Sequence, residues 1–282
     1  MKRLLDTLQS QYTNGLFAYS VAIVDNDSHQ SAENAVRSFR ETSELEVRYY
    51  VEPEQNIALA RNMAARNAKG NLIAFIDDDE LPPPDWLLRL FTSYTALEID
   101  GVLGPVLPVY EGVPPVWVLK GRFYERPSHK TGTILDWEHT RTGNVLLKRS
   151  IFDNPDSRFR PEFGRGGEDR DFFRRVMQKG WRFAWCSEAP VFEAVSPERY
   201  KRSIMLKRAL VRGANAPYDD DPFSHLKSLV AIPLYTLILP VLALMPHHLF
   251  MRYLIKDFDH IGRLLSLVGI DAVKEKYIVT GS

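Results

Sequence analysis

The sequence predicts an α/β fold in which a mostly parallel sheet is flanked by helices. Three short apolar or alternating runs have the length and pattern of buried strands, and they lie at residues 21–25, 46–51 and 72–76. Between the second and the third run, apolar residues recur at helical spacing. Two of the runs end at acidic residues, Asp25 and Asp77. Because ligands of such sheets bind at the carboxyl ends of the strands, we expect a functional site there.

The composition is that of an ordinary folded protein, with 282 residues of which 45% are hydrophobic. Lysine plus arginine and aspartate plus glutamate each total 36, so the net charge is zero and no overall field attracts nucleic acid. Cys186 is the only cysteine, which excludes an internal disulfide and a cysteine-based zinc site and is typical of a reducing compartment. Residues 1–11 are amphipathic and unlike a secretion signal, so we expect a cytoplasmic protein.

The first half of the chain alternates between strand and helix patterns. Apolar residues at helical spacing predict a helix over residues 56–68, and Gly70 follows where that helix would end. The apolar run at 72–76 leads into the acidic residues 77–80, three prolines and a new helix from Asp85.

The middle of the chain has a weaker pattern. Residues 101–140 are rich in proline, glycine and aromatic residues without clean periodicity, and we expect irregular structure there. Gly143 and Asn144 precede a short apolar run, and glycines at 164–167 precede a helix that begins near Glu168. Glycines at such a position allow the backbone to approach a ligand closely.

A long segment without charged residues occupies positions 229–246. Prolines at 233, 240 and 246 predict that a straight spanning helix is broken, so we expect a broken or re-entrant segment seated in a membrane. The alternative is a helical hairpin buried in a soluble core. Basic residues between 201 and 212 suit anionic lipid headgroups or a pyrophosphate.

The acidic run Asp77-Asp78-Asp79-Glu80 is the strongest candidate for chemistry. Carboxylates crowded after a buried strand repel one another unless a cation joins them, and carboxylate oxygens prefer a hard divalent ion. The alternative interpretation is a solvated acidic turn that caps the helix beginning at Asp85.

A second acidic group, residues 168–171, opens the helix that follows the glycines. Carboxylates at this position gain from the helix dipole, and one of them could accept a proton from an attacking hydroxyl. The alternative is plain helix capping, with Asp171 paired to Arg174 or Arg175 one turn later.

Taken in order from about residue 4 to residue 215, four motifs resemble those of the family two glycosyltransferases of the GT-A fold. They are Ile23-Val24-Asp25-Asn26-Asp27-Ser28, Asn56 with Ala60-Arg61-Asn62, Ile76-Asp77-Asp78-Asp79, and Gly167-Glu168-Asp169 with Asp171. The resemblance implies transfer of a sugar from a nucleotide-diphosphate sugar to an acceptor hydroxyl. It also implies a divalent metal cofactor, Mn²⁺ or Mg²⁺.

The resemblance implies a role for each matching residue. Asp169 corresponds to the general base that deprotonates the acceptor, with Glu168 as a supporting acid, and a single base on the acceptor side implies inversion at the anomeric carbon. Asp79 corresponds to the direct metal ligand. The residues expected to bind the nucleotide carrier are Asp25, Asp27, Arg61, Asp77 and Asp78.

Other positions match the family less closely. Gly143 and Asn144 correspond to the segment that lines the acceptor side, and their alternative is a simple turn before a strand. Glu193 stands where many relatives carry a histidine that helps to bind the metal or the diphosphate. Arg199 could neutralise the departing diphosphate, or could belong to a solvated basic helix face. The family's usual first strand is apparently missing, because Met1 already lies in the helix that normally follows it.

These observations predict a GT-A-like transferase domain over residues 1–216 and a helical, membrane-associated region over residues 217–282. Asp219–Asp221, between two prolines, would belong to the linker. We therefore expect a protein at the inner face of the cell membrane, acting in polysaccharide or glycolipid synthesis. Its partners would be a nucleotide-sugar donor, a glycan or glycolipid acceptor and the membrane surface, and not nucleic acid.

Two other functions remain open at the level of the sequence. A nucleotidyltransferase also uses an α/β sheet and acidic metal ligands, but it usually has a glycine-rich phosphate loop near its start, and this sequence shows none. The other is a non-catalytic, membrane-associated scaffold with a degenerate transferase fold.

Overall fold

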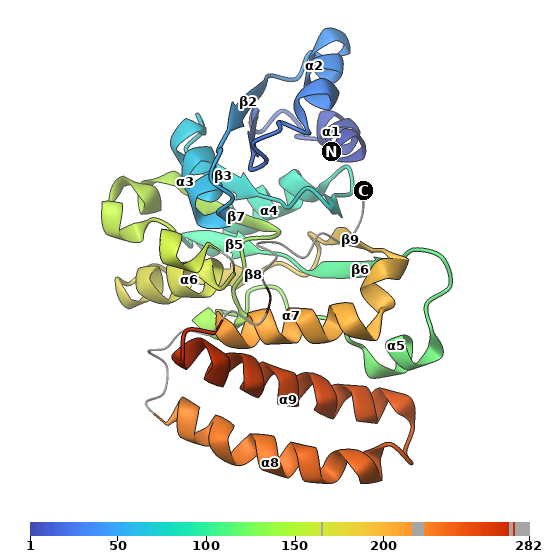
Figure 1. Ribbon diagram of the computed structural model, residues 1–282. Helices are drawn as coiled ribbons and strands as arrows, with labels where there is room; N and C mark the ends of the chain where they lie inside the picture. The colour runs from blue at the N-terminus through green and yellow to red at the C-terminus, as the bar shows by residue number, and fades with distance from the viewer. Residues whose placement is uncertain (165, 216–222, 271–272, 274–282) are drawn as a thin grey trace. The chain divides into compact units, whose positions relative to one another are not determined.

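The computed structural model describes residues 1–164, 166–215, 223–270 and 273 (Figure 1). The chain forms two compact units. Unit 1 comprises residues 1–108, 126–164 and 168–194, and unit 2 comprises residues 109–125, 165–167 and 195–282. The domain boundary expected at residues 216 and 217 and the acidic linker at 219–221 lie outside the described residues.

Unit 1 combines short strands with longer helices. Its strands are β1 (Val21–Asp25), β2 (Val47–Val51), β3 (Leu72–Phe75), β4 (Glu80–Leu81), β5 (Gly101–Leu103), β7 (Val145–Lys148) and β8 (Phe183–Trp185). Its α-helices are α1 (Lys2–Gln9), α2 (Glu33–Thr42), α3 (Ile57–Asn67), α4 (Trp86–Leu97) and α6 (Glu168–Gln178). Single 3₁₀ turns are η1 (Trp137–His139), η2 (Arg149–Asp153), η3 (Pro155–Ser157) and η4 (Pro161–Phe163).

Strands β6 (Val106–Tyr110) and β9 (Val191–Val195) run from unit 1 into unit 2. The remaining elements of unit 2 are α5 (Val116–Gly121), η5 (Pro197–Tyr200), α7 (Arg202–Ala214), α8 (Ser224–Leu242) and α9 (His247–Leu267). Residues 101–140 are thus more regular than expected, because they contain β5, β6 and α5.

The α/β class is confirmed, but the expectation of a mostly parallel sheet is wrong. β1 pairs with β2 in parallel, with Asp25 opposite Val51. In the sheet ordered β3-β7-β5-β8, β7 runs antiparallel to both of its neighbours, and β5 and β8 are parallel. A strand buried on both faces has the same apolar pattern in either direction, so the sequence carried no sign of the reversal.

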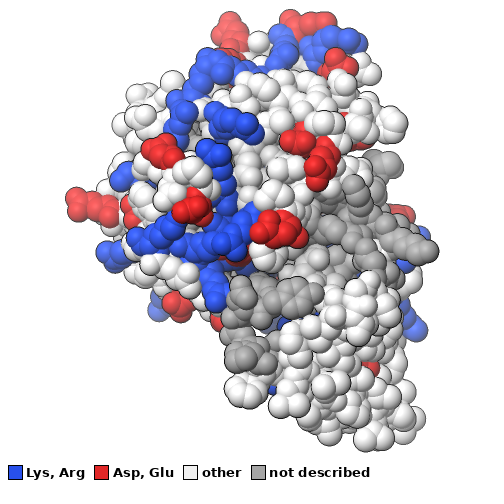
Figure 2. Space-filling view, turned by 60° about the vertical axis from the view of Figure 1, so that its left-hand side comes forward, with Lys and Arg blue, Asp and Glu red and all other residues white. Residues whose placement is uncertain are grey.

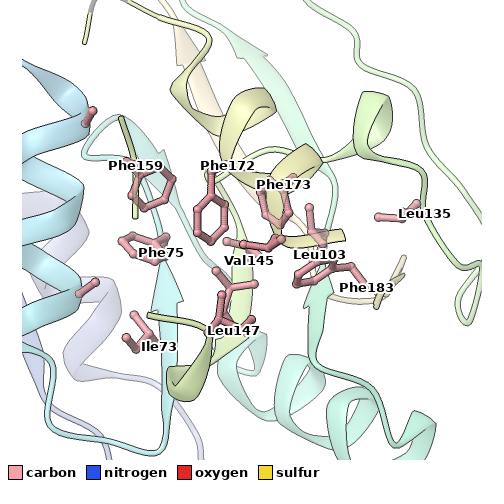
Figure 3. Close-up of a cluster of buried hydrophobic side chains, with 14 of the residues drawn as sticks. Ile73, Phe75, Leu103, Leu135, Val145, Leu147, Phe159, Phe172, Phe173 and Phe183 are labelled. Atoms are coloured by element: carbon pink, nitrogen blue, oxygen red, sulfur yellow. The ribbon is translucent and has the colours of Figure 1, made fainter. Parts of the chain in front are cut away.

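The four-stranded sheet carries a hydrophobic core on each face, because side chains alternate along each strand. Ile73 and Phe75 of β3 contribute to the core on one face, together with Phe172 and Phe173 of α6, as Figure 3 shows. The intervening Ala74 packs with the buried residues of α1 and α4 on the other face. Helices α3 and α6 therefore cover one side of this sheet, and α1 and α4 cover the other.

In unit 2, helix α9 lies between α7 and α8 (Figure 1). Glycines bring α7 and α9 together: a Cβ on Gly213 would lie 1.9 Å from the carbonyl oxygen of Asp259, and one on Gly262 would lie 2.2 Å from that of Leu210. This close approach leaves no room for a larger residue at either position.

Helix α8 corrects two expectations for the C-terminal region. It continues through Pro233 and Pro240, although an interior proline costs a helix about 3 kcal/mol, so the expectation that the prolines break it is wrong. By length and composition His225–Leu242 is the one helical segment of the described chain that could cross a membrane, and 6% of it is buried. That exposure contradicts the alternative of a hairpin buried in a soluble core.

Candidate active site

The end of β1 is organised by the carboxylate of Asp25, which is buried. Its two oxygens accept hydrogen bonds from the backbone N–H groups of Asp27 at 3.0 Å and Ala32 at 2.9 Å, and from the Tyr49 hydroxyl at 2.7 Å. Burial and the charge of Asp25 raise the pKa of Tyr49, which therefore remains a donor. A hydrogen bond from the backbone of His29 lowers the pKa of the Asp27 carboxylate. The predicted nucleotide contacts Asp25 and Asp27 thus shape one loop.

Two asparagines connect this loop to the start of α3. The Asn26 side chain donates to the carbonyl of Glu52 at 3.0 Å and accepts from the backbone N–H of Asn56 at 3.0 Å. Asn56 caps α3 by accepting from the N–H of Ala58 at 3.0 Å, and its amide donates to the carbonyl of Pro161 at 2.9 Å. The N-terminus of α3 is therefore fixed beside the ends of β1 and β2.

Arg61, on α3, joins the two acidic motifs of the sequence. Its guanidinium donates to Asp77 Oδ1 at 3.1 Å and to Glu168 Oε1. The arginine side chain is 11% exposed and that of Glu168 is 5% exposed, so this ion pair is largely shielded from water. The pKa of Arg61 is raised because the charges of Asp77, Glu168 and Asp169 outweigh the opposing effect of burial. Arg61, which the sequence analysis expected to bind the nucleotide carrier, thus bridges two acids.

Glu168, the first residue of α6, has a strongly shifted pKa. Burial raises its pKa to about 7, the Arg61 charge opposes that rise, and the charge of Asp169 adds to it. Its second oxygen, Oε2, is buried and has no hydrogen-bond partner among the residues that the structure describes. Asp169 is half-buried and accepts from the backbone N–H of Arg170 at 2.7 Å.

Asp171 makes the pairing within α6 that was considered as the alternative to a catalytic role. It is buried and accepts from Arg175, one turn later, at 2.8 Å, and Arg160 lies 3.5 Å from its other oxygen. This carboxylate is therefore committed to the fold of α6 and its neighbouring loop.

The acidic turn after β3 has one buried member, Glu80. Its Oε2 accepts from the backbone N–H of Asp77 at 3.1 Å, and the backbone N–H of Glu80 donates to the carbonyl of Asp77 at 3.1 Å. Burial and the charge of Asp77 raise the pKa of Glu80 well above its usual range. Gly143 packs here, since a Cβ at that position would lie 2.7 Å from Glu80 Oε1 and 3.2 Å from Asp77 Oδ2. The exposed Asp78 and Asp79 complete the turn.

A second buried acid lies directly across the strand pair. Glu193 of β9 stands opposite Glu80 of β4 in the antiparallel register. Arg126 donates to Glu193 at 2.5 Å and lies 4.0 Å from Glu80 Oε1. The Arg126 guanidinium therefore lies beside two buried carboxylates.

Both polar atoms of the buried Asn144 side chain make hydrogen bonds within the protein. Its backbone adopts a φ of 59°, and its oxygen accepts from the Trp86 indole N–H at 2.7 Å. Its amide donates to the carbonyls of Pro105 at 2.9 Å and Ala189 at 2.8 Å. Asn144 thus holds the turn that places Gly143 against the acidic residues.

Arg199, the remaining predicted residue, belongs to unit 2. It is buried, its guanidinium carbon lies 5.1 Å from the centre of the Tyr124 ring, and its carbonyl accepts from the Tyr124 hydroxyl. This packing differs from the solvated helix face considered as its alternative.

The chemistry of the acidic turn suits a divalent cation that takes its other ligands from phosphate oxygens and water. Within the described residues no group of three or more His, Cys, Asp or Glu side chains is arranged to hold a metal ion by itself. Asp78 and Asp79 are exposed at this turn, and burial together with the charge of Asp77 raises the pKa of Glu80. A divalent cation would offset the repulsion among carboxylates that lie this close together. The residues present therefore fit a cation shared with a phosphorylated ligand.

Comparison with known proteins decides the family. The model of glycosyl transferase family 2 matches residues 1–154, more than half of the chain. This chain belongs to that family. The match covers the motifs from Asp25 to the acidic turn and includes Gly143 and Asn144.

One curated relative of this family 2 chain is the succinoglycan biosynthesis protein ExoM of Rhizobium meliloti (strain 1021). It is 34% identical over 197 residues, which is 68% of this chain, and the match spans 62% of the relative's length. Crystal structures of S. aureus TarS residues 1–349 share the fold. The complex with UDP has a TM-score of 0.51 at 18% identity, and the complex with UDP-GlcNAc has 0.52 at 17%. Each match covers 96% of this chain and 90% of the TarS chain.

The structure brings several of the predicted residues of this family 2 chain together. Arg61 connects Asp77 to Glu168, and Gly143 contacts Asp77 and Glu80. Sequence reasoning did not assign roles to Glu80 and Arg126, although Glu80 ends the acidic run. A buried acid beside exposed ones was not recognisable from the run alone, and Arg126 lies in a stretch without periodicity.

Proposed function

We propose that this chain transfers a sugar from a nucleoside-diphosphate sugar to an acceptor hydroxyl in the synthesis of a polysaccharide or glycolipid. Membership of glycosyl transferase family 2 and the likeness to a succinoglycan biosynthesis protein support this reaction class. Within the structure, the bridge made by Arg61 is the observation that carries the proposal. It holds the acidic turn after β3 next to the acidic start of α6. Sugar transfer would require this proximity between the binding site of the sugar donor and the general base.

Asp169 is the proposed general base. The acceptor hydroxyl attacks the anomeric carbon and loses its proton to the Asp169 carboxylate, while the bond from that carbon to the diphosphate oxygen breaks and the electron pair leaves with the diphosphate. A single displacement of this kind inverts the anomeric configuration. Asp169 is half-buried, whereas Glu168 is buried, bound to Arg61 and carries a raised pKa of about 7. Glu168 is therefore better suited to position Arg61.

Asp79, with Asp77 and Asp78 beside it, is the proposed holder of a Mn²⁺ or Mg²⁺ ion. When bound, such an ion would supply charge that stabilises the departing diphosphate. The side chains of this turn would then bind the donor only in its metal-loaded form, and Asp25, Asp27 and Arg61 would fix the walls of the nucleotide site through the contacts described above.

Replacing the proposed base should separate chemistry from binding. Asp169→Asn keeps the size of the side chain but cannot take up the proton, so turnover should fall about 100-fold or more while donor affinity stays close to that of the wild type. Nucleoside-diphosphate release and calorimetric titration of the donor measure the two effects. Asp156→Asn, at an exposed acid, is the matched control. Nearly normal turnover of Asp169→Asn would refute the assignment.

The proposed metal ligand is tested by binding. Asp79→Ala should abolish the difference in donor affinity between calorimetric titrations with and without Mn²⁺, because the cation loses its protein ligand. Asp85→Ala removes a half-buried acid close by in the sequence, which pairs with Arg89, and should leave that difference intact. If the Asp79 variant retained the full metal dependence, this residue would not belong to the site.

Association with the inner face of the cell membrane is part of the proposal. The support is helix α8, which is apolar, exposed and long enough to reach across a bilayer. An acceptor carried on a lipid would then be met at the surface where the enzyme is held. Sedimentation of the full chain with lipid vesicles tests this association, and a chain that stays in solution at every lipid composition would contradict it.

A further inference from the structure

One face of α8 consists entirely of exposed apolar side chains. The large residues on this face are between 54% and 76% exposed and recur at helical spacing: Leu226, Leu229, Val230, Leu234, Leu237 and Val241. The lower part of Figure 2, where α8 lies, is almost free of charged side chains. A contiguous apolar surface of this kind marks an interaction site, because soluble proteins rarely leave such a surface open to water.

The opposite side of α8 packs along α9 through polar as well as apolar side chains. Ser228 Oγ lies 3.0 Å from His260 Nδ1, and the Thr236 hydroxyl donates to Asp257 at 3.5 Å. The Tyr235 ring packs against the His260 ring with their centres 5.7 Å apart. These contacts are spread over the first and second halves of α8, so the helix is fixed along α9 in a definite register.

The charges of this helix pair favour an anionic partner. Lys227 of α8 and Arg252 and Lys256 of α9 are exposed. Both acids of α9 are engaged within the protein: Asp257 is buried beside Thr236, and Asp259 pairs with Arg212 at 2.7 Å. The helix pair therefore carries exposed basic groups together with an exposed apolar face, a combination that suits anionic headgroups above an apolar layer.

We propose that α8 lies in the plane of an anionic lipid surface, with its apolar face inserted and α9 on the headgroup side, and that it does not span the bilayer. This inference rests on the membrane association proposed above and specifies its geometry. The 19 residues of α8 are long enough to span. Spanning would also draw α9 into the hydrocarbon, with Arg252, Lys256 and Arg263 on it. Each charged side chain at the bilayer centre costs about 3 kcal/mol or more, whereas in the plane these charges stay at the interface.

Flotation with lipid vesicles tests the inserted face. The full chain should float with vesicles of phosphatidylcholine and phosphatidylglycerol, and L234E combined with L237E should lower the bound fraction at least about tenfold, because two inserted leucines are lost. V113E combined with V116E changes two other exposed valines of unit 2 and should bind like the wild type. Equal thermal melting of all variants excludes unfolding. Unchanged flotation of the leucine variant would overturn the proposal.

Cysteine labelling distinguishes an in-plane helix from a spanning one. Lys227→Cys and Met245→Cys place a thiol near each end of α8, and the natural Cys186 is buried. Protein added to intact vesicles should react at both ends with an impermeant maleimide. Protection of either end until detergent is added would show a spanning helix and overturn the in-plane geometry, while leaving membrane association and sugar transfer intact.

A second copy of the chain is the competing occupant of the apolar face. Sedimentation in vesicle-free buffer should then show a dimer that L234E with L237E converts to a monomer, with vesicle binding unaltered. That combination would overturn the lipid assignment, whereas a monomeric wild type that binds vesicles supports it.

Discussion

At the scale of single residues, Arg61 connects the two acidic motifs of the site. It bonds to Asp77 on the turn after β3, whose side chain is 45% exposed, and to Glu168 at the start of α6, where both partners are largely shielded from water. A buried charge without its partner is far costlier than the same charge at the surface. The sequence identified Arg61, Asp77 and Glu168 as functional, but it could not show that the arginine binds the two acids, because that contact joins residues 107 positions apart.

Removing this bridge should destabilise the fold. Arg61→Ala leaves Glu168 buried without its cation, and the free energy of unfolding should fall by about 3 kcal/mol or more. Arg61→Lys keeps the charge but loses the fork that reaches both acids, so it should recover only part of the loss. Urea denaturation measures these changes. Arg66→Ala, at an exposed arginine of the same helix, should change the stability little, and an equal loss in both alanine variants would contradict this account.

Glu168 should make stability depend on pH. Its pKa is raised to about 7 in the fold against an ordinary value of 4.5, so the native state binds the proton more tightly than the unfolded chain does. Stability from this group is therefore fully present below pH 4.5 and is lost as the pH rises through 7. The loss is at most about 3 kcal/mol.

Thermal melting between pH 5 and pH 8 measures that loss when the wild type is compared with Glu168→Gln, which cannot titrate. The wild type should lose melting temperature relative to the variant across this range. Glu162→Gln, at an exposed glutamate of η4, should show no such pH-dependent difference. A constant difference between the wild type and Glu168→Gln would show that Glu168 does not titrate in this range.

At the scale of elements, local sequence patterns predicted where the strands lie but not how distant strands pair. Residues 21–25, 46–51 and 72–76 were expected as strands, and β1, β2 and β3 occupy almost the same positions. Hydrophobic periodicity and capping act over a few residues, which explains this success. The reversal of β7 depends on how distant segments pack, and no local pattern encodes it. The continuity of α8 through two prolines was likewise not predictable from the local pattern, because an interior proline favours a break.

Asn144 stabilises the turn that leads into β7. Asn144→Ala should lower the free energy of unfolding by about 2 kcal/mol or more, because Trp86 and two backbone carbonyls lose their buried partner. Asn144→Gly loses the same bonds but tolerates the φ of 59°, so it should be about 1 kcal/mol more stable than the alanine variant. Chemical denaturation compares the two, and a glycine variant no more stable than alanine would argue against strain at this position.

At the scale of the whole molecule, family membership and fold agree with the motif order in the sequence. The GT-A-like class was predictable because each motif follows a strand or opens a helix, and the family model covers most of those motifs. The identities of the donor and acceptor depend on loop shapes that similar folds vary freely, so neither the motifs nor the fold determines them.

Turnover of a nucleotide sugar is the most direct test of the account. The full chain with Mn²⁺ is incubated with UDP-, GDP- and dTDP-sugars, and release of the nucleoside diphosphate is measured beside the thermal shift that each donor produces. We predict that at least one donor raises the melting temperature and is turned over slowly with water as the acceptor, and that Asp169→Asn abolishes the turnover without removing the shift. A chain that no donor stabilises and that releases no diphosphate would be a scaffold with a transferase fold.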